Sequence, residues 1–341
     1  MKKAVLLSIS TIIFISLFAV STNANIGKVA PAKVGVLIYD ESVYFYSLIR
    51  DDLLKLEKES QGREELIFYN AENNQELQNK QLDELINMGV NLIILSIVEA
   101  NAYDSVIEKI KQSGIPVIFL GRGPRDFKIL KTYPKSIYIG SDACQSGIIQ
   151  GQMIINELKN KEIIDRTKTN RLDYFLLKGS LNDIATNVRS NCVINELERN
   201  GIVFREVASE YCNWRRECAQ EKIREFIKTR KNDIDLIIAN NDEMAIGAVL
   251  ALQEIGYNTG NPEKYIPVVG VDGTDLAIEL IERGEMAGTV IQDHEAMSNA
   301  VYRTGMNMIR GREPIEGTDF KYQTNQVIII PYNGYVTRKL L

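Results

Sequence analysis

Histidine is almost missing from this sequence, because His294 is the only one among 341 residues. A zinc site built on imidazole and a Ser-His-Asp triad both need this side chain, so neither is expected. The four cysteines, Cys144, Cys192, Cys212 and Cys218, show no CxxC spacing. No activated nucleophile stands out either, and an enzyme is therefore the remote alternative among the function classes.

Signals for nucleotide and nucleic-acid binding are also missing. No GxGxxG follows the first predicted strand, and neither GxxxxGKS nor GxxxxGKT occurs anywhere. Acidic residues outnumber basic ones by 45 to 40, and a formal net charge of −5 argues against a nucleic-acid surface. What is present is a globular composition, 45% apolar and 25% charged, with enough chain for two domains.

The first residues are typical of an export signal. Met1-Lys2-Lys3 precedes an apolar run over residues 4–20, and Thr22-Asn23-Ala24 is a candidate cleavage site. We therefore expect residues 1–24 to direct the chain to the extracytoplasmic face of the membrane, the periplasm or the medium. Without cleavage the run would act as a membrane anchor, since about 17 apolar residues is the lower limit for a spanning helix. In an exported protein Cys212 and Cys218 could close a small disulfide loop, although the sequence does not establish connectivity.

Strand and helix patterns alternate from Lys33 onward, which predicts an α/β fold. The first half has strands at Val34–Tyr39, Glu65–Asn70, Asn91–Ile97 and Ile115–Leu120, with helices between them at Phe45–Ser60, Leu77–Met88 and Ala102–Gln112. The alternation of strands and helices begins again at Tyr174–Leu177, with further strands predicted at Val203, Leu236–Ala239, Val268–Val271 and Gly288–Ile291. This repetition indicates two lobes, each a doubly wound parallel sheet with right-handed crossovers.

The stretch Asp235–Gly256 joins an apolar strand to a polar corner and an alanine-rich helix. Asn240, Asn241 and Asp242 stand where the strand ends, which is where ligands bind in open α/β sheets. The alternative is that these side chains cap the helix. We weigh the two readings equally for Asn240 and Asp242, and favour a ligand role for Asn241.

Five longer segments carry a resemblance to a known family: YIGSDACQSGIIQGQMI (Tyr138–Ile154), LLKG (Leu176–Gly179), IIANNDEMAIGAV (Ile237–Val249), VVGVDGTDLAIELIERGEMAGTV (Val268–Val290) and VIIIPYNGY (Val327–Tyr335). With them, Lys33–Asn333 resembles the periplasmic sugar-binding proteins of the galactose/glucose group, which are ribose-binding-like type I solute-binding proteins. A sugar-responsive repressor with the same core is disfavoured, because the export signal occupies the place of a helix-turn-helix.

The resemblance implies two lobes joined by three hinge segments, expected near Gly140-Ser141, Gln292-Asp293 and Gln323–Val327. The first lobe would comprise residues 33–140 and 293–323, and the second residues 141–292 and 327–341. Closure about such hinges couples ligand contacts to a change in outer shape.

The resemblance also implies a sugar held between aromatic faces by fixed donors and acceptors. Phe45 and Trp214 match the two faces, although a core indole is the alternative for Trp214. Arg189 matches an arginine that donates to sugar oxygens. Asn241 and Asp272 match polar residues at two strand ends of the second lobe.

Several positions depart from the family. Val43, beside Tyr44, replaces an aspartate; Ser96 and Gln292 replace asparagines; Asp183 replaces a histidine; and Ala185 replaces an aspartate. Because about half of the hydroxyl-binding set is altered, a hexose held by the family's network is less expected, and a smaller or differently substituted sugar, such as a pentose, becomes credible. We expect Asp183 to face solvent. The predicted ligand-binding set is Tyr44, Phe45, Ser96, Asp183, Arg189, Trp214, Asn241, Asp272 and Gln292.

The calcium-binding loop of the family is not retained in this sequence. The aligned positions are Asp165, Thr167, Thr169, Arg171 and Asp173, with Asp235 as the distant carboxylate. Calcium needs oxygen ligands, and a guanidinium at a ligand position opposes a cation. We therefore predict no calcium site and no cofactor.

These features predict a monosaccharide-binding protein that performs no chemistry on its ligand. The closed form would dock on the outer domain of a sensor histidine kinase, as in xylose sensing, or on the permease of a galactose/glucose/xylose-type ABC transporter. The altered pocket and the lack of a cysteine near residue 20 favour the kinase. The membrane would be reached only through the N-terminal segment or this partner.

Overall fold

The computed structural model describes residues 30–161, 163–230 and 233–338. The export signal expected over residues 1–24 lies outside the described residues. Within the described part of the chain, no helix is long and apolar enough to cross a membrane.

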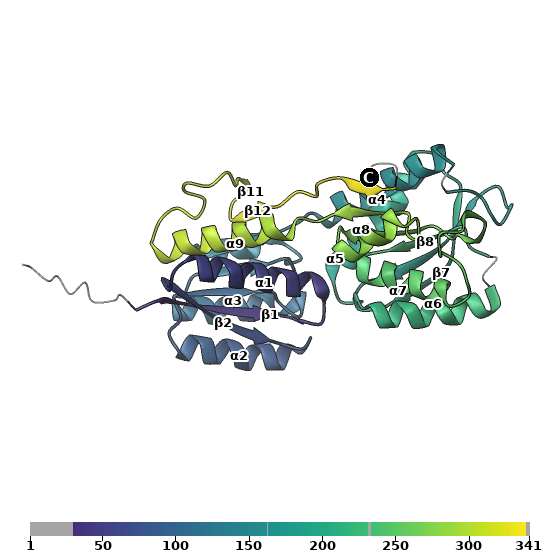
Figure 1. Ribbon diagram of the computed structural model, residues 1–341. Coiled ribbons are helices and arrows are strands. Elements are labelled where there is room, and N and C mark those ends of the chain that lie inside the picture. The colour runs from purple at the N-terminus through teal and green to yellow at the C-terminus, as the bar shows by residue number, and fades with distance from the viewer. Residues whose placement is uncertain (1–29, 162, 231–232, 339–341) are drawn as a thin grey trace, which may run out of the picture. The chain divides into compact units, whose positions relative to one another are not determined.

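Two separate sheets confirm the predicted two-lobed α/β fold (Figure 1). The seven-stranded sheet of the first lobe has the order β11-β12-β5-β4-β3-β1-β2. Its strands pair in parallel except for β11 and β12, which are antiparallel. They are β1 (Ala32–Ile38), β2 (Glu64–Asn70), β3 (Leu92–Leu95), β4 (Val117–Leu120), β5 (Ser136–Gly140), β11 (Tyr322–Thr324) and β12 (Val327–Ile329).

The six-stranded sheet of the second lobe has the order β13-β10-β9-β8-β6-β7. Its pairs are parallel except for β10 and β13. Its members are β6 (Leu172–Lys178), β7 (Phe204–Tyr211), β8 (Leu236–Ala239), β9 (Val268–Asp272), β10 (Gly288–Ile291) and β13 (Tyr335–Thr337). The central strands β3 and β8 are buried along their whole length, which explains their uninterrupted apolar sequences LIIL and LIIA.

Helices cover the sheets of both lobes. In the first lobe α1 (Tyr44–Glu59) and α9 (His294–Ile309) pack side by side, and α2 (Gln75–Asn87) and α3 (Tyr103–Ser113) pack together (Figure 1). In the second lobe α4 (Ala143–Lys159) packs on α5 (Ile184–Arg199), and α6 (Arg216–Arg230) on α7 (Asp242–Gln253), with α8 (Asp275–Glu282) following β9. Short 3-10 turns occur at Ala100–Ala102, Phe127–Thr132 and Pro262–Lys264.

Two disulfides lie in the second lobe. Cys212–Cys218 closes the loop between β7 and α6, so the small loop considered from the sequence is confirmed. Cys144–Cys192 joins α4 to α5, a pairing that the sequence did not suggest. The two helices approach closely at Gly147, where a Cβ atom would overlap the backbone carbonyl oxygen of Arg189. This tight pair fixes the part of α5 that carries Arg189.

Three segments pass from one sheet to the other. The first runs from β5 into α4, the second from β10 into α9, and the third from β12 to β13. The third crossing was wrongly expected at Gln323–Val327, with residues 327–341 in the second lobe. Val327 instead pairs with Tyr138 of β5, so β12 extends the first sheet and the crossing follows Ile329. The apolar run at 327–330 is buried there, except for the half-buried Ile329, because it fills that edge of the first lobe.

Candidate functional site

One cavity lies where the carboxyl ends of strands from both sheets meet. About 610 Å³ of space lies between the surrounding protein atoms, part of it open to solvent. Residues of both lobes line it: Tyr39, Val43, Phe45, Tyr46, Gly121 and Arg122 from the first, and Ser141, Ala143, Asp183, Ala185, Arg189, Trp214, Asn241, Asp272, Gln292 and Tyr332 from the second lobe and the crossings.

Aromatic side chains from both lobes form walls of this cavity. Phe45 comes from the first turn of α1, and Trp214 comes from the loop that the Cys212–Cys218 disulfide closes. The backbone at Asn213 and Trp214 is left-handed, with φ of 49° and 66°, which costs energy in residues other than glycine. The closed loop therefore holds the indole in place, and Trp214 is only 7% exposed.

Arg189 is held by three acceptors, one for each nitrogen of its guanidinium. Its Nε donates to Ser146 Oγ at 2.8 Å, one terminal nitrogen to Tyr332 Oη at 2.8 Å, and the other to the carbonyl oxygen of Asn240. The guanidinium carbon lies 5.8 Å from the Trp214 ring centroid. The guanidinium is thus a preorganised, planar cation at the cavity.

Asp272 ends β9 in an unusual conformation. Its φ is +137°, a region that residues with a Cβ rarely adopt, and its side chain lines the cavity. Burial raises the pKa of Asp272 well above the usual range, nearby Asp242 raises it further, and Arg189 opposes the shift. Backbone strain and a perturbed carboxylate occur together at many ligand and active sites, which makes Asp272 a candidate for contact with a ligand.

Asp242 is completely buried near Asp272 and does not line the cavity. Its carboxylate accepts hydrogen bonds from Thr274 N at 2.8 Å, Thr274 Oγ1 at 3.1 Å and Thr289 Oγ1 at 2.6 Å. Burial raises the pKa of Asp242 to about 6, while these hydrogen bonds act in the opposite direction. Asp242 therefore ties α7 to β10 and to the loop after β9.

The side chains of Asn240 and Asn241 make more hydrogen bonds within the protein than the sequence led us to expect. Asn241 is the N-cap of α7, because its Oδ1 accepts from Met244 N at 3.1 Å, so it does cap the helix, the reading that the sequence favoured less at this position. Its Nδ2 donates to the carbonyl oxygen of Trp214 at 3.2 Å, and the side chain also lines the cavity. Asn240 Oδ1 instead accepts from Gly179 N at 3.2 Å.

Seven of the nine predicted site residues line the cavity: Phe45, Asp183, Arg189, Trp214, Asn241, Asp272 and Gln292. The other two, Tyr44 and Ser96, are not among the residues that line it. Tyr44 is 40% exposed at the start of α1, because residues next to each other on a helix point about 100° apart and Phe45 faces the cavity. Ser96 directly follows β3 and is completely buried away from the cavity.

Asp183 is buried rather than facing solvent as expected, with 9% of its surface exposed. One carboxylate oxygen caps α5 by accepting from Ala185 N at 2.9 Å. The other accepts from Arg122 Nη1 of the first lobe, also at 2.9 Å. This ion pair bridges the lobes, and the burial follows from it.

Arg122, Tyr39, Tyr46 and Tyr332 line the cavity but were not predicted. Arg122 stands two residues after β4, and a search of every strand end would have included it. Tyr332 lies in the third crossing and was missed because that crossing was misplaced. Tyr39 and Tyr46 follow the apolar pattern of β1 and α1, so their sequence positions read as core.

A family profile described as the periplasmic binding protein domain matches residues 34–313. The chain belongs to this family. The predicted resemblance to type I periplasmic sugar-binding proteins is thereby confirmed.

Named relatives of this periplasmic binding protein are similar over most of its length. It is 33% identical to the D-galactose/methyl-galactoside binding periplasmic protein MglB of Haemophilus influenzae, over 92% of either chain. It is 26% identical to a xylitol-binding protein of Mycolicibacterium smegmatis, over 82% of this chain and 73% of that one. Both relatives are named as binding proteins.

Solved structures share the fold. An ABC transporter solute binding protein from Bacillus halodurans with bound myo-inositol has a TM-score of 0.73 at 23% identity, covering 92% of this chain and 96% of its own. A galactofuranose binding protein has a TM-score of 0.74 at 19% identity, covering 91% and 95%.

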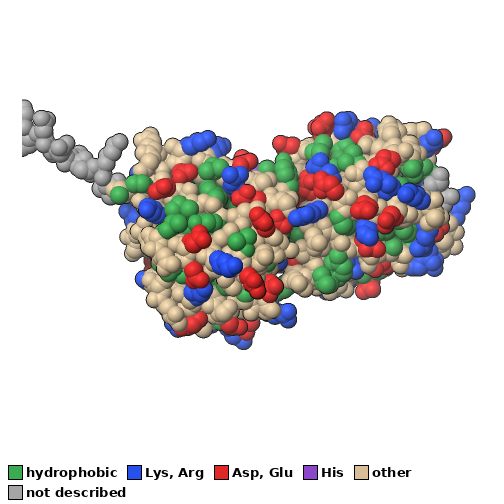
Figure 2. All heavy atoms as spheres, turned by 90° about the horizontal axis from the view of Figure 1, so that it is seen from below, with side chains coloured by type: hydrophobic (Ala, Val, Ile, Leu, Met, Phe, Trp, Pro, Cys, Tyr) green, Lys and Arg blue, Asp and Glu red, His purple; other side chains and the backbone are tan. Residues whose placement is uncertain are grey.

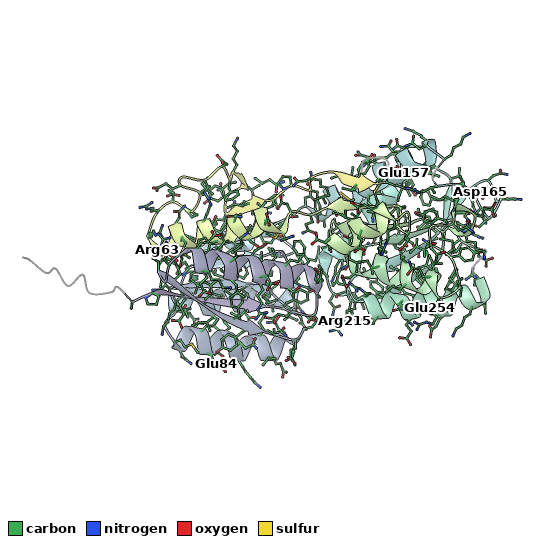
Figure 3. The ribbon with its side chains drawn as sticks, in the orientation of Figure 1. Arg63, Glu84, Glu157, Asp165, Arg215 and Glu254 are labelled. Carbon is green, nitrogen blue, oxygen red and sulfur yellow. A yellow bond between two sulfur atoms is a disulfide. The ribbon has the colours of Figure 1, made fainter. Side chains whose placement is uncertain are left out.

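The loop aligned with the calcium site of the sugar-binding family is occupied by the chain's own donors. Asp173, 1% exposed, accepts from Arg171 Nε at 2.8 Å and Arg205 Nη2 at 2.7 Å. Asp235 accepts from Thr167 N and Asp173 N, both at 2.8 Å. Among the described residues no group of three or more His, Cys, Asp or Glu could hold a metal ion. Asp165, of the same loop, lies in the part of the second lobe remote from the first (Figure 3).

The surface carries no large field of one charge on the face shown in Figure 2, where acidic and basic side chains are interspersed over both lobes. This agrees with the small net charge of −5. The surface thus offers nothing typical of a nucleic-acid contact there.

Proposed function

We propose that this periplasmic binding protein binds one neutral monosaccharide in the cavity and performs no chemistry on it. The observation that carries the proposal is the convergence of two aromatic faces, Phe45 and Trp214, with the fixed polar groups Arg189, Asn241 and Asp272. Aromatic faces suit the C–H surfaces of a sugar ring, and buried donors and acceptors select its hydroxyl pattern.

The sugar would be an aldose, a pentose or a hexose. Support comes from relatives that are named for the aldoses D-galactose, ribose and D-xylose. Val43, Ala143 and Ala185 contribute apolar lining, so fewer hydroxyls can be paired there than elsewhere in the cavity.

Thermal-shift screening of the whole protein against D-xylose, D-ribose, D-glucose and D-galactose tests the proposal. A ligand that binds only the folded state stabilises it by mass action, about 2.7 kcal/mol at 100 times its Kd. We expect one or more of these sugars to raise the Tm at millimolar concentration. If no monosaccharide does so, the proposal fails.

We further propose that the sugar-bound form docks on an extracytoplasmic membrane partner. An ABC permease is supported by relatives named as import binding proteins and ABC transporter solute binding proteins. The outer domain of a sensor histidine kinase is the second candidate, favoured by the extent to which the family's hydroxyl-binding positions are altered. Sugar-dependent complex formation with the purified permease, compared with the kinase outer domain, separates the two.

A further inference from the structure

A buried ion pair connects the two lobes directly at the cavity. Arg122 follows β4 of the first lobe, and Asp183 begins α5 of the second. Arg122 Nη1 lies 2.9 Å from Asp183 Oδ2, and the two side chains are only 8% and 11% exposed. We propose that this pair is a lock that stabilises the closed arrangement of the lobes and so raises the fraction of the protein that is closed before a ligand binds.

Each partner is also held by contacts within its own lobe. The Arg122 guanidinium lies over the Tyr39 ring, 4.2 Å from its centroid, and Nη2 donates to the Val98 carbonyl oxygen at 2.9 Å. Asp183 is fixed because its other oxygen caps α5 through Ala185 N. Little side-chain entropy is therefore lost when the two meet, which distinguishes the pair from a flexible surface salt bridge.

The ion pair has good hydrogen-bond geometry, but its net contribution to the free energy of closing the lobes is limited. Opening the cleft would return both charges to water, and that hydration offsets most of their mutual attraction. Burial by itself lowers the pKa of Arg122, but Asp183 and the neighbouring tyrosines raise it above its usual value, so the guanidinium stays charged. A charge-assisted hydrogen bond is worth about 10-fold or somewhat more in an equilibrium constant, and we expect an effect of that size.

A second contact between the lobes provides a matched comparison. Arg215, which Figure 3 shows on the side of the second lobe next to the first, reaches Asp40 Oδ2 at 3.4 Å and Ser42 Oγ at 2.8 Å. Its side chain is 51% exposed, so solvent screens this contact. Arg215 does not line the cavity. The structure thus contains one buried and one exposed pair across the same junction.

The lock has a consequence for sugar binding. If the closed arrangement is the binding-competent one, the apparent Kd equals the intrinsic Kd divided by the closed fraction. A lock that raises this fraction strengthens binding of every ligand by the same factor, in addition to any direct contact that Arg122 or Asp183 makes with the ligand from the cavity wall. Arg122 and Asp183 would therefore set affinity, while Asp272 and Asn241 set selectivity.

Small-angle X-ray scattering of the ligand-free protein tests the proposal, using Arg122→Gln, Asp183→Asn and their combination. Asparagine keeps the helix cap and removes only the charge. We expect a larger radius of gyration in all three variants, an effect of the double variant no greater than that of either single one, and no change for Arg215→Gln. Unchanged Tm values would show that each lobe remains folded.

Sugar dissociation rates give a second readout. We expect koff to rise about tenfold for each stabilising sugar in Arg122→Gln and Asp183→Asn, and not in Arg215→Gln. If the ligand-free variants scatter like the wild type, the lock does not exist, even when sugar affinity falls. The scattering experiment needs no ligand, so its result stands whether or not the proposed sugar binding is confirmed.

Discussion

The Trp214 indole lies directly against Gly179, so closely that a Cβ atom on Gly179 would overlap the ring. Gly179 follows β6, whose neighbour β7 leads into the disulfide loop that carries Trp214. The close approach needs a residue without a side chain, and LLKG provides it. One wall of the cavity is thus set by a glycine that itself does not line it.

Gly179→Ala should therefore displace the indole and weaken sugar binding about tenfold or more, because the stacking face moves. Calorimetric titration of the variant with the stabilising sugar measures this. Trp214→Phe in the same background should recover part of the loss relative to Gly179→Ala alone, since a smaller ring leaves room for the methyl group. Additive losses in the double variant would show that Gly179 acts elsewhere.

Two substitutions of Asp272 should weaken sugar binding equally but should differ in their effect on stability. Both Asp272→Ala and Asp272→Gly remove the carboxylate, and hydrogen bonds to charged groups are worth about 1.5–3 kcal/mol, so affinity should fall about 10- to 100-fold in each.

The two Asp272 variants should differ in Tm, because a φ of +137° strains alanine but not glycine. Strain of this kind costs about 1–3 kcal/mol, which corresponds to a Tm for Asp272→Gly at least about 2 °C above that of Asp272→Ala. Equal Tm values would mean that the backbone at this position relaxes. Normal sugar binding by either variant would place the ligand elsewhere.

Added Ca²⁺ or a chelator should leave the Tm of the wild-type protein unchanged. Arg171 and Arg205 already neutralise Asp173, and backbone N–H groups are directed at Asp235. A calcium ion would have to displace these donors and approach two guanidinium groups. Differential scanning calorimetry with and without EDTA measures the effect, and a chelator-induced drop of several degrees would show that the loop holds a cation.

The two disulfides should contribute to different properties. Cys144–Cys192 spans 48 residues and Cys212–Cys218 spans 6. Chain-entropy estimates give about 4 kcal/mol for the longer loop and about 2 kcal/mol for the shorter one. Replacing both cysteines of the longer loop by serine should therefore lower the Tm more.

Replacing Cys212 and Cys218 by serine should weaken sugar binding more, because their loop holds Trp214 in a left-handed conformation. Measuring Tm and Kd for both double variants compares the effects. The account of the loop is contradicted if the Cys212/Cys218 variant binds sugar like the wild type.

The sequence predicts the fold well because burial of parallel strands leaves a strong local signal. Short uninterrupted apolar runs such as LIIL and LIIA are typical of central strands, and polar residues that follow strands supply part of the cavity lining. Phe45, Arg189 and Asp272 were found in this way or through the resemblance. The two sheets and the family membership followed from the same patterns.

The features that the sequence did not predict depend on contacts between distant segments. The pairing of β12 with β5 sets the third crossing, and no local pattern distinguishes it from a strand of the second lobe. The partnership of Arg122 with Asp183 joins residues 61 positions apart in different lobes. Tyr44 was placed beside Phe45 in the site, and only the phase of α1 decides which of the two faces the cavity.

The central claim is that a monosaccharide binds in this cavity, and fluorescence of Trp214 tests it most directly. Trp214 is the only tryptophan in the chain, it lines the cavity, and it is 7% exposed, so its emission reports on this site alone. Titration with the sugar that raises the Tm should change the emission in a saturable manner with one site per chain. A sugar that stabilises the protein but leaves Trp214 emission unchanged would contradict the account, because it would bind somewhere else.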